Sequence, residues 1–295
     1  MRILFFSSVC KSLEIFQVAS ESYLKLNREG FELDYLFLDD NRDPRTKEYL
    51  AKLVAEREDA SFLDFQMDTQ TEYTNHDWDS KKIDRIIAIK NAAIREALSG
   101  GYDYLFLVDS DLVLHPDTLA SLVEAGKDFI FSIFWTKFRE DSPYTPNAWD
   151  FHSWNYHSED SYYRLKEPGV FEVGGGGACT LLSRELLEKG LNFNRLSSMN
   201  FQGEDRHFCT RAQALGYGLF VDSRLPCYHI FQDEMAPEAA AWYAQGARRD
   251  FFDRWLDAQW RQEVKRRFEY DPRFSVRVKK FLYEVRNSFS NHFLA

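Results

Sequence analysis

The sequence predicts an α/β fold built on a mostly parallel sheet, and two observations lead to this prediction. Short apolar runs alternate with longer amphipathic segments through the first half of the chain, a pattern typical of strands joined by helical crossovers. One of these runs, residues 104–108, leads directly into the acidic triplet Asp109, Ser110 and Asp111. Ligands of open α/β sheets bind beyond the carboxyl ends of the strands, so this triplet marks the expected site.

The elements follow in a regular order. The expected strands are Ile3–Phe6, Leu33–Leu38, Ser61–Phe65, Tyr104–Val108 and Phe129–Phe134. The expected helices are Leu13–Leu26, Arg45–Glu56 and Ile83–Leu98, the last with an isoleucine and leucine stripe along one side. After Phe134 the alternation stops. Residues 137–168 form a long expected loop in which Trp149, Trp154 and Tyr156 are candidates for stacking on an acceptor or closing over a donor.

Composition limits the class of partner. The chain has 295 residues, 37 Lys plus Arg and 47 Asp plus Glu, for a formal net charge of −10. Nucleic-acid binding gains most of its free energy from basic side chains, so an acidic chain of this kind is not expected to bind nucleic acid. At 44% hydrophobic and 16% aromatic residues, it has material for a dense core and for a pocket that takes flat apolar faces such as those of sugars and bases.

Localisation and redox state follow from features that the sequence lacks. The apolar run Ile3–Phe6 is too short for a secretory signal, and no stretch approaches the roughly 20 apolar residues that span a bilayer. A cytosolic protein is therefore expected. The four cysteines show no CxxC spacing, which predicts free thiols instead of a disulfide framework or a structural zinc site.

Asp109 and Asp111 point to a divalent cation. Two carboxylates one residue apart at the end of a buried strand are costly unless a cation compensates them. Mg²⁺ and Mn²⁺ take oxygen ligands and commonly share them with phosphate. The same pair also suits a polar strand end before a helix that starts near Pro116 and Asp117, so the pattern alone leaves both interpretations open.

The order of further segments adds to this signal. The segments are LFLDD at 36–40, AIKNA at 88–92, VGGGG at 173–177, GED at 203–205 and CYHIF at 227–231. Together with the Asp-x-Asp strand, this ordered set resembles the GT-A glycosyltransferases, in particular the family 2 enzymes that use nucleotide-sugar donors. The glycine-rich and GED segments are also similar to the Anp1 mannosyltransferase branch. The resemblance covers about residues 2–232 and implies a GT-A fold, a Rossmann-like nucleotide-sugar-binding sheet with flanking helices.

The resemblance also implies roles for single residues at the donor site. Asp40, with Asp39 beside it, is placed at the nucleotide base. Lys90 replaces the arginine of the family's Arg-Asn pair and, with Asn91 retained, is expected near the base or the phosphates. The remaining donor-site residues are given by the Asp-x-Asp strand and the CYHIF segment. Asp109 is expected at the ribose or at the metal through water, and Ser110 beside it in the donor site. Asp111 is expected on the metal, with His229 as a further metal ligand.

Proton chemistry is assigned to the GED segment. A carboxylate of this pair removes the acceptor hydroxyl proton in the family pattern, and Asp205 is favoured over Glu204. The alternative is that both carboxylates complement a helix N-terminus before Arg206–Leu215. Gly175 and Gly176, within four consecutive glycines, are placed against the donor sugar because glycine allows close backbone approach; a flexible turn is the alternative.

Two other classes compete with the transferase interpretation. The string LFLVDSDLV at 105–113 fits the opening motif of haloacid dehalogenase-like phosphatases, with Asp109 as nucleophile, Asp111 as acid/base and Ser132 in the second motif. A non-catalytic sugar-binding module on the same scaffold is the other alternative. Neither one accounts for the GED and CYHIF segments as chemistry.

The chain divides into an expected domain at 1–235 and a basic amphipathic helical extension at 236–295. The extension carries 12 Lys plus Arg against 8 Asp plus Glu, so its net charge is +4. A helical pair packed on the domain and a contact with an anionic membrane or another partner are both consistent with this composition. Phe251 stands where processive relatives have the Gln of a Gln-x-x-Arg-Trp motif, which favours transfer of a single sugar. The expected acceptor is a saccharide, a lipid-linked group or a protein.

Overall fold

The structure is a computed structural model that describes residues 1–65, 80–136, 144–151, 164–199 and 203–253. Its strands are β1 (Arg2–Val9), β2 (Glu32–Asp39), β3 (Ala60–Phe62), β4 (Tyr104–Val108), β5 (Leu112–Val113), β6 (Phe129–Thr136), β7 (Thr145–Pro146), β8 (Ala148–Trp149), β9 (Val170–Val173), β10 (Gly175–Gly176), β11 (Cys179–Ser183) and β12 (Leu219–His229). Its helices are α1 (Leu13–Leu24), α2 (Pro44–Ala55), α3 (Ser80–Ser99), α4 (Thr118–Glu124), α6 (Arg184–Glu188), α7 (Glu204–Ala214), α8 (Ala236–Ala244) and the short 3-10 helix η1 (Asp233–Met235).

Local sequence explains where several helices begin. The Ser12 hydroxyl accepts a hydrogen bond from the Ile15 amide at the start of α1. Asp43 caps α2, and Pro44 follows it in the first turn, where its missing N–H is not needed. The expected α/β alternation is therefore confirmed, and it is set by caps and apolar runs close together in sequence.

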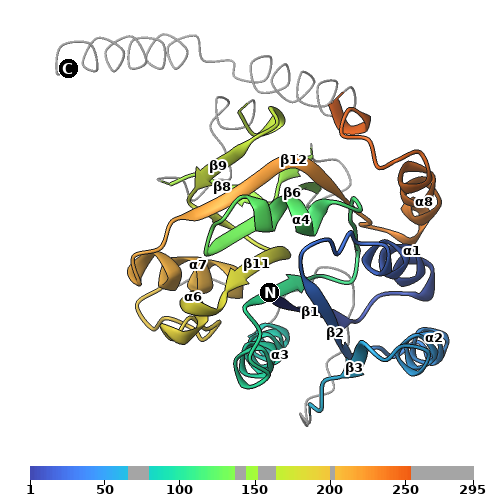
Figure 1. Cartoon of the computed structure of the whole chain (residues 1–295), viewed down its shortest axis with the longest axis horizontal. Coiled ribbons are helices and arrows are strands. Elements are labelled where there is room, and N and C mark those ends of the chain that lie inside the picture. The colour runs from blue at the N-terminus through green and yellow to red at the C-terminus, as the bar shows by residue number, and fades with distance from the viewer. Residues whose placement is uncertain (66–79, 137–143, 152–163, 200–202, 254–295) are drawn as a thin grey trace, which may run out of the picture.

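The main sheet has the strand order β3-β2-β1-β4-β11-β6-β12-β5 (Figure 1). Strands β3, β2, β1 and β4 pair in parallel, and β6 pairs in parallel with β12. Strand β11 lies antiparallel between β4 and β6. The sequence predicted a mostly parallel sheet, which is confirmed, but the direction of β11 did not follow from its composition, because a fully buried apolar strand reads the same in either direction.

Helices cover both faces of the sheet (Figure 1). Alternate residues of β1 show the division: Ile3 and Phe5 belong to the apolar cluster that includes α1, α2 and α4, whereas Leu4 and Phe6 belong to the cluster that includes α3, α6 and α7. Trp242 of α8 and Phe252 pack on Tyr228 of β12, with ring centroids 5.6 and 5.9 Å from the tyrosine ring. The apolar side chains on the two faces of the sheet are therefore covered by two layers of helices, and the strand ends carry polar side chains.

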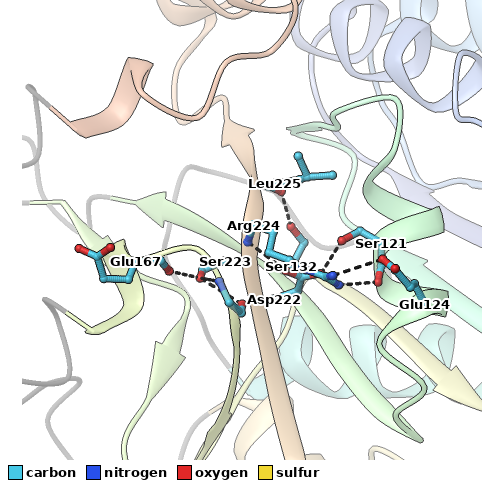
Figure 2. A network of polar contacts seen from close by, with 9 residues as sticks. Ser121, Glu124, Ser132, Glu167, Asp222, Ser223, Arg224 and Leu225 are labelled. Carbon is cyan, nitrogen blue, oxygen red and sulfur yellow. Dashed lines mark hydrogen bonds and ion pairs between the residues drawn. The ribbon is translucent and has the colours of Figure 1, made fainter.

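Strand β12 is held by a polar network around a register shift between Asp222 and Cys227 (Figure 2). The Asp222 carboxylate accepts hydrogen bonds from the Ser121 hydroxyl at 2.7 Å and from the Arg224 guanidinium at 2.9 Å. Figure 2 also shows the Ser132 hydroxyl donating to the Leu225 carbonyl, at 3.0 Å. Because these contacts fix the irregular stretch, the strand resumes in a defined register and ends at His229.

Some expectations fall outside the described residues. Trp154 and Tyr156 of the aromatic loop, and the extension from residue 254 onward, belong to this group. In the part of the chain that is described, no helix combines the length and the apolar character needed to cross a membrane. The cysteines Cys10, Cys179, Cys209 and Cys227 are free thiols, as expected.

Candidate functional site

The carboxyl ends of β1, β2 and β4 meet at one edge of the sheet because these strands run in parallel. Two hydrogen bonds tie the loops together there. The Asp40 amide donates to the Val9 carbonyl at 3.1 Å, and the Cys10 amide donates to the Ser110 hydroxyl at 3.4 Å. Ser110 is buried, so its hydroxyl supports the loop of β1 in this structure. The acidic segments after β2 and β4 therefore share one edge.

Asp111 is brought to His229 by strand pairing. The antiparallel register places His229 of β12 opposite Leu112 of β5, and the Ile230 amide donates to the Asp111 carbonyl at 2.9 Å. His229 Nε2 lies 3.4 Å from Asp111 Oδ2, and its Nδ1 lies 2.9 Å from the Thr136 hydroxyl. The end of β6 therefore fixes the ring that β12 presents to Asp111.

Lys11 is the second partner of Asp111. Its Nζ lies 2.8 Å from Asp111 Oδ2, with the Asp111 side chain 8% exposed and the Lys11 side chain 29% exposed. Burial alone would raise the pKa of Asp111, but Lys11 and His229 outweigh burial and hold that pKa well below its usual range. The Asp111 charge in turn raises the pKa of Lys11. Asp111 is therefore a stable carboxylate in a cationic setting.

The residues around Asp111 suit a divalent cation in part. A carboxylate and an imidazole are good ligands for Mn²⁺, and Thr136 orients the imidazole as hydroxyl or carbonyl partners do in metal sites. Within the described residues, no group of three or more His, Cys, Asp or Glu side chains is placed to hold a metal. Two protein ligands are sufficient for ions that keep water and share the oxygens of a substrate phosphate. The chemistry of the donor set therefore fits an ion that binds together with a diphosphate.

Glu204 and Asp205 form a second acidic group in the first turn of α7. The helix begins after Gly203, whose φ of +113° favours glycine. Lys90 of α3 reaches both carboxylates, with Nζ 2.7 Å from Glu204 Oε1 and 3.3 Å from Asp205 Oδ1. The ammonium also lies 5.1 Å from the centre of the Phe193 ring. Lys90 was expected at the base or the phosphates; in this structure it pairs with the acidic group of α7.

The two carboxylates differ in proton affinity. Burial raises the pKa of Asp205 to about 7, against the opposing effect of Lys90 and with the Glu204 charge adding to the rise. Burial also acts on Glu204, but its closer contact with Lys90 outweighs burial and lowers the pKa. Glu204 therefore stays ionised near neutral pH, whereas Asp205 can hold or release a proton there.

Asp109 interacts electrostatically with members of both groups. It is exposed, but the protein around it replaces much of its water and raises its pKa to about 6, and the charges of Asp111 and Glu204 add to this rise while Lys90 and Lys11 oppose it. The same carboxylate also raises the pKa of Asp205. Asp109 therefore interacts electrostatically with both the Asp111 group and the α7 group, which makes the three a single site.

The acidic pair after β2 is held by cations that sequence reasoning missed. Asp40 forms an ion pair with Arg85 of α3, whose Nε lies 3.0 Å from Asp40 Oδ1. The Asp40 and Arg85 side chains are 7% and 14% exposed. Asp39 is more open and lies 3.6 Å from Lys47. Asp39 is thus the more accessible member of the pair.

Asn91 bonds to the loop before α7. Its side-chain oxygen accepts from the Phe193 amide at 2.8 Å, and its nitrogen donates to Asn194 Oδ1 at 2.8 Å. Asn91 therefore holds the loop before α7 against α3, the helix that carries Lys90. Its expected role at the donor stays a prediction.

The four glycines are required by close packing. A Cβ on Gly175 would lie 2.3 Å from the Trp149 ring, and one on Gly176 would lie 2.1 Å from the Phe131 ring. Strand β10 pairs with β8 here instead of forming a free turn. A Cβ on Gly177 would lie 2.8 Å from Asp205 Oδ2. The glycines therefore let β10 pass close to Trp149 and let the Asp205 carboxylate lie against Gly177, and their contact with a donor sugar stays a prediction.

Lys11, Arg85 and Thr136 are the site residues that sequence reasoning missed. Lys11 follows a strand, Arg85 precedes Lys90 on the same helix, and Thr136 ends β6. A cation one or two residues after the first strand of an acidic α/β site is the only signal that the sequence offered, and it is a weak one.

Comparison with known proteins was made at the level of sequence and of structure. No protein-family model matches the chain, and no curated protein sequence matches it. Among solved structures, residues 1–349 of S. aureus TarS in complex with UDP-GlcNAc have a TM-score of 0.48 and 16% identity, over 77% of this chain and 58% of that one. GalNAc-T7 with UDP, GalNAc and Mn²⁺ has a TM-score of 0.52 and 12% identity, over 77% of this chain and 43% of that one.

This chain therefore spans about half the length of the solved structures it resembles. The phosphatase alternative assigned Ser132 to its second motif. In the structure β6 continues to Thr136, and Ser132 lies buried within the strand against Leu225. The likeness to GalNAc-T7 and the mixed sheet with helices on both faces agree with the resemblance found in the sequence: the chain has the GT-A fold.

Proposed function

We propose that this protein is a metal-dependent glycosyltransferase, similar to the family 2 enzymes, that moves one sugar from a nucleotide-diphosphate sugar to an acceptor hydroxyl. The observation that carries the proposal is the presence of two ion-paired groups, Lys11–Asp111–His229 and Lys90–Glu204–Asp205, that both include residues interacting electrostatically with Asp109. One group suits the charge of a leaving diphosphate, and the other suits removal of a proton.

The donor side is built by Asp39, Asp109, Asp111 and His229. The proposed donor is UDP-linked or GDP-linked; the solved structure of GalNAc-T7, which shares the fold, contains UDP, GalNAc and Mn²⁺. Asp111 and His229 would hold Mn²⁺ or Mg²⁺, which when bound supplies positive charge that stabilises the leaving diphosphate. Asp39 is accessible for the base, whereas Asp40 reaches it only through a rearrangement of its ion pair with Arg85.

Asp205 is the proposed base. Its pKa of about 7 lets it accept the acceptor hydroxyl proton near neutral pH, and a base of this kind contributes about 10²–10⁴-fold in rate. Glu204 is committed to Lys90 and has a lowered pKa, so it is the weaker candidate. The absent side chain at Gly177 lets the Asp205 carboxylate lie close to the backbone there, because a Cβ would lie 2.8 Å from Asp205 Oδ2. We propose direct displacement with inversion.

The acceptor side is less defined. A saccharide, a lipid-linked group or a protein hydroxyl fits the proposed chemistry. We propose that the +4 segment 236–295 contacts an anionic membrane or another partner, and that the protein is cytosolic. Co-sedimentation of the protein with anionic liposomes at low salt tests the membrane contact, and absence of binding would contradict it.

Thermal shift with a panel of nucleotide sugars, each with and without Mn²⁺, tests the function. UDP- or GDP-sugars are expected to raise the melting temperature, and Mn²⁺ is expected to enlarge the shift, because a ligand that binds only the folded state stabilises it. Stabilisation without release of nucleotide in the presence of acceptors would favour a non-catalytic sugar-binding module. No shift with any nucleotide sugar would remove the main support for the proposal.

A further inference from the structure

The proposed transfer gives no separate task to Lys11, which contacts Asp111. Lys11 stands two residues after β1, and its ammonium lies 2.8 Å from Asp111 Oδ2. The same oxygen lies 3.4 Å from His229 Nε2. Asp111 Oδ2 therefore faces both the Lys11 ammonium and the His229 imidazole, which would share a metal ion with Asp111. The inference that follows rests on the proposed function.

The ammonium and a divalent ion compete for this oxygen. Two cations on one carboxylate oxygen lie within a few ångströms of each other and repel each other, and the repulsion is larger when one of them is divalent. A metal ion on Asp111 therefore requires the Lys11 ammonium to move away.

The structure allows the ammonium to move while the backbone stays in place. The Lys11 carbonyl accepts hydrogen bonds from the Asn41 side chain and, at 3.4 Å, from the Thr46 hydroxyl, which hold the main chain. The side chain is 29% exposed, whereas Asp111 is 8% exposed. A four-carbon stem on a fixed backbone can swing its charge by several ångströms. Because Lys11 follows β1, its ammonium would stay near the same strand edge, where the oxygens of a bound diphosphate would offer it a new partner.

We propose that Lys11 is an exchangeable counter-ion: it neutralises Asp111 when the site is empty, yields Asp111 to the metal ion when the donor arrives, and then binds the diphosphate. This exchange couples the two ligands. A metal ion alone must displace Lys11 without giving it a new partner, whereas a metal ion bound with a diphosphate supplies one. By linkage, each ligand then raises the affinity for the other by the same factor.

The experiment measures Mn²⁺ binding by titration calorimetry, without and with saturating UDP, in the full chain. The wild type is expected to bind Mn²⁺ weakly alone and more tightly with UDP. Lys11→Met is expected to bind Mn²⁺ alone about tenfold more tightly and to lose at least the same factor from the enhancement by UDP, in line with typical coupling factors. Lys11→Arg keeps the charge and is expected to restore the wild-type pattern.

Two further variants make the result specific. Lys52→Met removes one positive charge from the exposed face of α2, where Lys52 is 72% exposed and paired with Glu56, and it is expected to leave both Mn²⁺ affinities unchanged. Lys11→Gln removes the charge but keeps a hydrogen-bond donor for Asp111. If Lys11→Met does not fold, the same changes in Mn²⁺ binding are expected of Lys11→Gln. Circular dichroism confirms the fold of each variant.

Unchanged Mn²⁺ affinity and unchanged enhancement by UDP in Lys11→Met or Lys11→Gln would overturn the counter-ion role and leave the proposed transferase standing. Loss of Mn²⁺ binding in those variants would also overturn it, because it would show that Lys11 supports the metal site. A wild type that binds neither Mn²⁺ nor UDP would overturn the proposed function together with the inference.

Discussion

Lys90 Nζ lies 2.7 Å from Glu204 Oε1 and thereby joins the middle of α3 to the first turn of α7. The Lys90 and Glu204 side chains are 13% and 9% exposed, so neither charge could be buried there alone. The lysine also lies 3.3 Å from Asp205 Oδ1. One cation therefore keeps Glu204 ionised and moderates the raised pKa of Asp205.

The pH dependence of transfer tests this relationship. Because Asp205 must be ionised to accept a proton and its pKa is about 7, kcat is expected to rise with pH through about 7. Lys90→Met removes a cation that favours the ionised form, so the midpoint of this rise is expected to move to higher pH. The measurement is kcat against pH at saturating donor, with Lys52→Met as the charge-matched control on α2. A midpoint that stays in place or moves down would contradict the assignment.

Asp205→Asn and Asp111→Asn should separate transfer from donor binding. Asp205→Asn is expected to keep UDP binding in the presence of Mn²⁺ and to lose about 10²–10⁴-fold in kcat. Asp111→Asn is expected to lose the effect of Mn²⁺ on UDP affinity. Calorimetry and a nucleotide-release assay measure the two properties, and equal loss of donor binding in both variants would contradict the division of roles.

The raised pKa of Asp205 also has a consequence for stability. A carboxyl whose pKa is higher in the folded state than in the unfolded state favours folding most at low pH, and this contribution is lost as pH rises through the folded-state pKa. Asn, which carries no charge, does not lose it. Asp205→Asn is therefore expected to raise the melting temperature more at pH 8 than at pH 5, measured by calorimetry. An equal change at both values would contradict the shift.

The close contact between Gly177 and the Asp205 carboxylate can be tested with one methyl group. In Gly177→Ala the new Cβ would lie 2.8 Å from Asp205 Oδ2 unless the carboxylate moves. The carboxylate is the free end of a side chain, so stability is expected to change little. Misplacement of the base is expected to lower kcat by about tenfold to 10²-fold. Gly176→Ala, whose Cβ would lie 2.1 Å from the Phe131 ring, is expected to lower the melting temperature instead. The same effect from both variants would contradict a specific role for the contact between Gly177 and Asp205.

The parts of the fold that were predictable are those fixed by local sequence. Strand β4 is apolar over its whole length and ends at two carboxylates, so both the strand and its polar edge followed from composition. Strand β12 was missed because Asp222, Arg224 and Pro226 interrupt its apolar pattern. Asp222 and Arg224 bond to Ser121, which is about a hundred residues away in sequence. Only the folded chain shows that these polar residues stabilise a strand (Figure 2).

The same distinction applies to the site. Asp109 and Asp111 carry a local signal, since paired carboxylates at a strand end are costly without a cation. Which cations pair with the carboxylates of the site could not be predicted from neighbouring residues in the sequence. Lys11 and Arg85 look like ordinary solvated residues in the sequence. The contact of Lys90 with Glu204 depends on how α3 and α7 pack, so it did not follow from the sequence, and the expected position of Lys90 at the donor stays a prediction.

The ion pair of Asp40 with Arg85 gives the last prediction. Arg85→Met would remove the Arg85 charge from the Asp40 carboxylate, which is 7% exposed in this structure, and this is expected to cost about 3–5 kcal/mol of unfolding free energy. Adding Asp40→Asn removes the buried charge, so the double variant is expected to be more stable than Arg85→Met alone, by a coupling energy of about 0.5–3 kcal/mol. Urea denaturation measures each variant. The matched control is Arg195→Met, which breaks an exposed pair with Asp84 on the same helix and is expected to cost less than about 1 kcal/mol. If Arg85→Met costs no more than this control, the pair is not what holds α3 against the end of β2.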